Sequence, residues 1–106
     1  MLTETPIELA GRHLFLRYST RDLLRAEAAL GKPIVATLQK GEELSLQDMS
    51  TLIKYGLKTQ DMKQISEEQY EDILDQVAPI DFITTAAKAL NLAFSSTKKE
   101  ENTGKN

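Results

Sequence analysis

Hydrophobic and polar residues alternate near the start of the chain, before the spacing of apolar residues becomes helical. In two short segments, every second residue is apolar: Ile7 and Leu9 in the first, and Leu14, Leu16 and Tyr18 in the second. Such alternation is typical of strands with one buried face. The sequence therefore predicts a β-hairpin in which Ile7–Leu9 pairs with His13–Tyr18 around a turn at Gly11. Because an isolated hairpin is only marginally stable in water, we expect it to pack on helices.

A helix with marked ends follows the hairpin. Ser19 or Thr20 can cap the segment Thr20–Leu30, and Asp22 stands three positions after Ser19, in the register of a capping box. Gly31 follows the last leucine, and glycine tolerates the left-handed backbone that ends many helices. Pro33–Gln39 is predicted to form a short second helix, because proline suits a first helical turn.

Three further helices are predicted in the second half of the chain. Ser45–Gly56 begins with a capping serine and ends at a glycine, and Ser66–Val77 combines a capping box with acidic residues in its first turn. Pro79–Phe94 is the last and most apolar helix. Between the first two, Lys58–Ile65 is predicted to be a polar connector.

The predicted fold is mainly α, with a short N-terminal β-hairpin followed by four or five helices in one small domain over residues 1–94. A chain of 106 residues is long enough for one core of this kind. Residues 95–106 are almost purely polar and cannot bury enough apolar surface to offset their ordering entropy, so this tail is predicted to be disordered.

Composition excludes several classes of function. The formal net charge is −3 and the sequence contains no cysteine, which argues against nucleic acid as a partner and excludes disulfides and cysteine-ligated zinc. No apolar stretch is long enough to cross a membrane, and the N-terminus lacks the pattern of a secretory signal. We therefore expect a cytoplasmic protein.

Catalytic chemistry has no support in the motifs. His13 is the only histidine, and the sequence has no H-E-x-x-H, no glycine-rich phosphate loop and no nucleophile elbow. The acidic residues of Ser66–Val77 fall on the side of the helix opposite its apolar residues, as expected for a solvated face. We expect no catalytic residue, no cofactor and no metal site, and therefore no enzyme.

Glu27 is the least expected residue of the helix Thr20–Leu30, because its carboxylate falls in the middle of the apolar face. As a structural anchor it would accept backbone N–H groups or pair with Arg17 or Arg25, since an unpaired buried carboxylate costs several kcal/mol. As an alternative, its stem could cover apolar surface while the carboxylate reaches water. A direct functional role is the third interpretation. Gly31 and Gly56 are the other residues assigned a structural role.

The apolar residues of Pro79–Phe94 span close to half of the helix circumference, which is wider than one contact stripe requires. One interpretation is a helix packed between two layers of its own domain. The other is that one side is kept for a protein partner. For this second interpretation, the candidate binding residues at the edges of the arc are Phe82, Ala89, Leu92 and Phe94.

The succession of motifs resembles the small tail assembly chaperones of long-tailed phages and related gene transfer agents. The family tends to open with a hairpin around a glycine, here IELAGRHLFLRYS, and continues with a helix that ends in a glutamate, a spacer and a glycine, here LLRAEAALGKPI with Glu27 and Gly31. A leucine-rich helix ending in glycine (DMSTLIKYGL), an acidic helix (SEEQYEDILDQV) and an alanine-rich helix (TTAAKALNLAF) follow.

This resemblance implies a non-enzymatic assembly factor that holds the tape measure protein, or another tail protein, while the tail tube polymerises and is absent from the finished tail. It leaves the oligomeric state open, a homo-oligomer included. One alternative is a phage or bacterial structural adaptor, such as a tail connector or terminator-like subunit. A small DNA-binding regulator is less favoured, because it would need a basic helix and no helix of this chain is convincingly basic.

Overall fold

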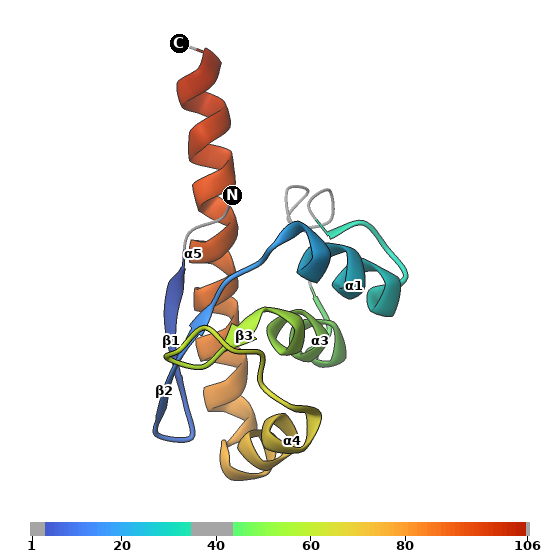
Figure 1. The fold of residues 1–106 in the computed structure, drawn as a ribbon, viewed down its shortest axis with the longest axis vertical. Helices are drawn as coiled ribbons and strands as arrows, with labels where there is room; N and C mark the ends of the chain where they lie inside the picture. The colour runs from blue at the N-terminus through green and yellow to red at the C-terminus, as the bar shows by residue number, and fades with distance from the viewer. Residues whose placement is uncertain (1–3, 35–43, 106) are drawn as a thin grey trace.

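The computed structural model describes the backbone of residues 4–34 and 44–105 and the side chains of residues 4–34 and 44–94. The N-terminal hairpin lies along one side of a long C-terminal helix, and three shorter helices lie on the opposite side of that helix (Figure 1). The predicted fold class, a mainly helical domain with an N-terminal β-hairpin, is confirmed. The predicted helix Pro33–Gln39 falls largely outside the described residues.

The hairpin consists of β1 (Thr5–Leu9) and β2 (Arg12–Leu16), paired antiparallel so that Ile7 faces Leu14. Its two-residue turn places Ala10 at φ 52° and Gly11 at φ 74°. Two positive φ angles match the right-handed twist of the strands, which is why tight hairpins favour glycine here. The alternation of apolar residues therefore predicted the hairpin and its buried face, but β1 begins earlier than predicted, at Thr5, and β2 ends at Leu16 instead of Tyr18.

A third strand of two residues lies at the start of the predicted polar connector and shares Lys58 with it. β3 (Leu57–Lys58) pairs with β2 through Leu16 and Phe15, and Lys58 also forms a bridge with Gln64. The sheet order is β1-β2-β3. Two residues are too few to show a period of two, so pattern analysis had no signal for this strand.

Three helices begin at the serines predicted to cap them. Helix α1 (Thr20–Leu30) and helix α4 (Glu67–Gln76) begin with complete capping boxes at Ser19 and Ser66. Helix α3 (Leu46–Gly56) has only half of the predicted box. Ser45 accepts the backbone N–H of Asp48, and the Asp48 carboxylate pairs with Lys32 at 2.7 Å.

Helix α5 (Pro79–Lys105) packs against both β1 and α3. It therefore uses its wide apolar arc between two layers of its own domain, as the first interpretation of that arc held. The backbone of α5 is helical beyond Phe94 to Lys105, into the stretch predicted to be a disordered tail. The side chains of residues 95–106 are outside the described part.

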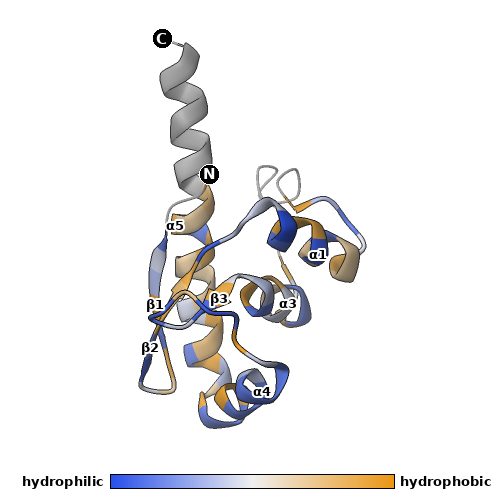
Figure 2. Ribbon diagram, viewed as in Figure 1, coloured by the Kyte–Doolittle hydropathy of each residue, from blue (hydrophilic) through white to orange (hydrophobic). Residues whose placement is uncertain are grey.

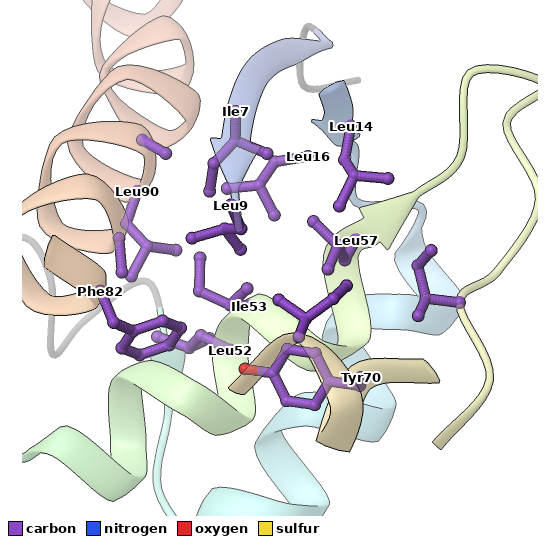
Figure 3. Packing of buried hydrophobic residues seen from close by; sticks show 14 of the residues in the cluster. Ile7, Leu9, Leu14, Leu16, Leu52, Ile53, Leu57, Tyr70, Phe82 and Leu90 are labelled. Carbon is purple, nitrogen blue, oxygen red and sulfur yellow. The ribbon is translucent and has the colours of Figure 1, made fainter. Parts of the chain in front are cut away.

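A single hydrophobic cluster joins the sheet to the helices. The hairpin contributes Leu9 and Leu16, α3 contributes Leu52 and Ile53, and α5 contributes Leu90, all buried. Figure 3 shows these side chains converging between the strands and the helices. Figure 2 shows the same division along the chain, with hydrophobic segments of α3 and α5 in the interior and the hydrophilic residues of α4 outside.

Tyr18 and Gly56 fix how the hairpin meets α3. The Tyr18 ring lies against Gly56, where an added Cβ would be 2.3 Å from the ring, and the phenol donates a hydrogen bond to the Leu52 carbonyl. The Arg17 N–H donates to the Gly56 carbonyl at 2.9 Å. α3 does end at Gly56, as predicted, but this glycine is needed because an aromatic ring occupies the space of a side chain.

Candidate partner-binding groove

Helices α3 and α4 are antiparallel, and side-chain contacts join them at two levels. The Tyr70 hydroxyl donates to the Ser50 carbonyl at 2.8 Å and lies 3.0 Å from the Ser50 Oγ. One turn further along α3, Lys54 Nζ donates to Glu67 Oε1 at 2.7 Å. These contacts hold the C-terminal end of α3 against the N-terminal end of α4.

Beyond these contacts, the two helices and the start of α5 enclose a groove of about 540 Å³. The α3 wall is largely polar and consists of Leu46, Gln47, Ser50 and Thr51. The wall from α4 and α5 is apolar and consists of Leu74, Val77, Pro79 and Phe82. Leu46 is 50% exposed. A large aliphatic side chain is thus open to solvent at the wall of the groove.

Electrostatics at the closed end of the groove follow from burial and from one ion pair. Burial of the phenol raises the pKa of Tyr70 to about 12, so this hydroxyl stays a neutral donor at physiological pH. The hydrogen bond from Lys54 to Glu67 raises the pKa of the ammonium, and Glu71 adds a smaller effect in the same direction. Glu71 therefore lies close enough to influence the charge at this end.

The four residues proposed from the sequence as a partner surface do not form one exposed surface. Phe82 and Ala89 are buried, and Figure 3 shows the Phe82 ring beside Leu52 in the core. Phe94 is half-buried, with its ring centroid 5.3 Å from that of Tyr18. Leu92 is 53% exposed. Phe82 borders the groove from inside, while Leu92 lies on a different part of α5.

Leu92 and Ala89 line a second hollow of about 470 Å³, between α5 and the hairpin. Its other residues include Glu8, Gly11 and Lys88, and its lining is more polar than that of the groove. Phe82 therefore borders the groove, whereas Ala89 and Leu92 border a separate hollow. We take the groove as the principal candidate because its apolar wall is continuous across α4 and α5.

Glu27 is placed as a structural anchor. Its Oε2 accepts the backbone N–H of Ile34 at 2.9 Å, and its backbone carbonyl accepts the N–H of Gly31 at 2.8 Å. Gly31 has φ 76°, the left-handed conformation expected of a helix-ending glycine. The side chain therefore holds the chain that leaves α1 by accepting a backbone N–H.

Within residues 4–34 and 44–94, no group of three or more histidine, aspartate or glutamate side chains could hold a metal ion. None of the helices in the described part is both long enough and apolar enough to cross a bilayer. Comparison with protein-family models, with curated proteins and with solved structures finds no match for this chain.

The groove itself was missed by analysis of the sequence. Leu46 and Leu74 belong to helical stripes that pointed to the core, and periodicity does not reveal which end of a stripe remains uncovered. The incomplete cover follows from the antiparallel contact of α3 with α4, which is tertiary. The one available signal was the run Val77-Ala78-Pro79-Ile80, whose apolar residues continue through the boundary between two predicted helices.

Proposed function

We propose that this protein is a non-enzymatic phage tail assembly chaperone that binds the tape measure protein during tail morphogenesis in the host cytoplasm. The observation on which this rests is the apolar groove between α3, α4 and α5, with Leu46 half exposed at its wall. The resemblance of the successive motifs to tail assembly chaperones supports the same proposal.

An apolar groove between helices suits an amphipathic helix as its occupant. Such a helix places side chains at i, i+3, i+4 and i+7 into the groove and leaves its polar side in water. A tape measure protein is long and largely helical, and its apolar faces need cover until the tube closes around it. The exposed aliphatic side chain of Leu46 at the groove is of the kind that partners bury.

Co-expression with the product of the long reading frame expected next to this gene tests the proposal. The groove variant is Leu46→Gln, which changes a lining leucine that is 50% exposed, and the matched control is Leu24→Gln, which changes a leucine that is 63% exposed on α1. We expect the wild type and the control to keep the client soluble and to co-purify with it, while the groove variant loses the client.

The rival surface is tested in the same assay with Leu92→Gln. Loss of the client with Leu92→Gln but not with the groove variant would move the contact to the hollow beside the hairpin. A client that stays insoluble and unbound with every variant would contradict the chaperone proposal. Stable rings that persist in the mature particle would instead favour the structural adaptor.

A further inference from the structure

The walls of the groove differ in chemistry, and this difference restricts what can occupy it. The α3 wall presents the neutral polar side chains of Gln47, Ser50 and Thr51, whereas the opposite wall is apolar. A helix in the groove therefore meets neutral polar groups along one flank and aliphatic groups beneath. Its other flank lies along the outer surface of α4.

That outer surface is strongly acidic. Helix α4 contains no lysine or arginine, and its carboxylates are Glu67, Glu68, Glu71, Asp72 and Asp75. At 100° per residue, Glu71 is about 60° around the helix from Leu74, which lines the groove, whereas Asp72 is about 160° away. Glu67 is only about 20° from Leu74, but its carboxylate is paired with Lys54 at 2.7 Å. Glu71 is thus the second carboxylate on the groove side, and Asp72 faces away from it.

Glu71 and Asp75 are not neutralised by a salt bridge within the described part of the chain. Lys54 is engaged with Glu67 at 2.7 Å, and neither Glu71 nor Asp75 forms a salt bridge there. Both side chains are exposed. Glu71 and Asp75 stand four residues apart, so they present two carboxylates about 6 Å apart along one side of α4.

From this charge arrangement we infer that the groove selects an amphipathic helix with lysine or arginine along the flank next to α4. The inference rests on the proposed function, because it specifies the client of the same groove. Cations four residues apart on the bound helix match the spacing of Glu71 and Asp75, while neutral polar residues suit the flank against α3. The apolar face supplies most of the affinity, and the charges select among helices.

Two synthetic 18-residue helical peptides test the inference. Both carry the same leucine face and the same serine and glutamine flank, and the remaining flank is lysine in one and glutamate in the other. Fluorescence anisotropy measures their affinity at 50 and 300 mM NaCl. We expect the lysine peptide to bind about tenfold more tightly at the lower salt, with the advantage shrinking at the higher salt.

Three variants locate the contact, each checked for folding by circular dichroism. Glu71→Lys should weaken the lysine peptide about three- to tenfold, while Asp72→Lys, the same kind of charge change on the far side of α4, should change it less than about twofold. Thr51→Trp places a large ring in the groove and should abolish binding of both peptides.

Each of the other outcomes would overturn one stated part of the inference. Equal binding of the two peptides, lost in Thr51→Trp, would overturn the charge selection and leave the groove as a helix site. Equal effects of Glu71→Lys and Asp72→Lys would mean nonspecific attraction to an acidic protein and would also overturn the selection. Binding of neither peptide, or binding unaffected by Thr51→Trp, would overturn the groove as a helix site and with it the basis of the proposed function.

Discussion

Lys58 Nζ donates to Asp22 Oδ2 at 3.0 Å, and this contact joins two residues 36 positions apart in the chain. The Lys58 and Asp22 side chains are 11% and 9% exposed. Lys58 also donates to Gln64 Oε1 at 2.9 Å, and Asp22 accepts the Ser19 N–H at 3.1 Å. The carboxylate therefore caps α1 and holds β3 to it at the same time.

Removing either charge of this pair should destabilise the fold. We expect Asp22→Asn and Lys58→Met each to lower the free energy of unfolding by about 2 kcal/mol, because each leaves a buried ion without its partner. The double variant should lose less than the sum, with a coupling of about 1 kcal/mol. Urea unfolding measures all three, with Asp72→Asn on the exposed face of α4 as the control. Strict additivity would contradict the pairing.

Acid should weaken the fold through the same carboxylate. Burial alone would raise the pKa of Asp22, but the Ser19 N–H and the Lys58 ammonium outweigh burial and hold it below its usual value. A lowered folded-state pKa gives stability that is present above the unfolded value of about 4 and is lost as pH falls through the folded value. Asp22→Asn should flatten this decline. Part of the decline should remain in this variant, because the pKa of Asp48 is also lowered, by its hydrogen bond with Lys32.

Alkali should unfold the protein through its buried phenols. Burial raises the pKa of Tyr70 to about 12 and raises that of Tyr18 further. Raised folded-state values give stability that is fully present below the unfolded pKa of about 10 and is lost as pH rises through them. In a pH titration, the phenolate absorbance of Tyr18 and Tyr70 should appear together with loss of the helical circular dichroism signal. Ionisation of both while the helices persist would contradict their burial.

Gly56→Ala should destabilise the protein by about 2–4 kcal/mol, because its Cβ would overlap the Tyr18 ring and the α3 backbone leaves it no other direction. Gly31→Ala is the comparison, and we expect it to cost only about 1 kcal/mol. An added Cβ at Gly31 meets no neighbouring atom, so the cost comes only from the left-handed backbone. Thermal unfolding distinguishes the two. Tyr18→Leu should relieve part of the Gly56→Ala loss, and full additivity would argue against the overlap.

Glu27 offers a test that separates charge from hydrogen bonding. Glu27→Gln keeps an oxygen that can accept the Ile34 N–H, so it should lower the free energy of unfolding by less than about 0.5 kcal/mol. Glu27→Ala leaves that donor without its acceptor and should cost about 1–2 kcal/mol. Equal losses in the two variants, measured by chemical unfolding, would show that the negative charge matters and not the acceptor.

Local patterns predicted the elements of this fold well. Capping serines, apolar alternation and helix-ending glycines all act within a few residues, and each of these signals was followed by the expected strand or helix. The functions of Asp22 and Gly56 were only half predicted. The sequence shows a cap and a helix end, but their partners Lys58 and Tyr18 are more than 30 residues away in the chain.

The candidate site was harder to predict, because it depends on which parts of each apolar stripe remain uncovered. Phe82 and Ala89 were assigned to a surface from their place on the wide arc of α5, but β1 and α3 cover that arc on two sides. Leu46 belonged to a stripe that is buried at Leu52 and Ile53 and open at its beginning. Only the tertiary arrangement of α3, α4 and α5 distinguishes these cases.

The edges of the small sheet have a consequence for how the protein behaves at high concentration. Pro6 removes a backbone donor from β1, exposed Glu8 adds a charge beside it, and the bridge from Lys58 to Gln64 covers the outer side of β3. Neither edge is a good template for another chain, so cross-β growth from this hairpin is disfavoured. The protein can thus accumulate to high concentration without itself becoming the seed of a fibril.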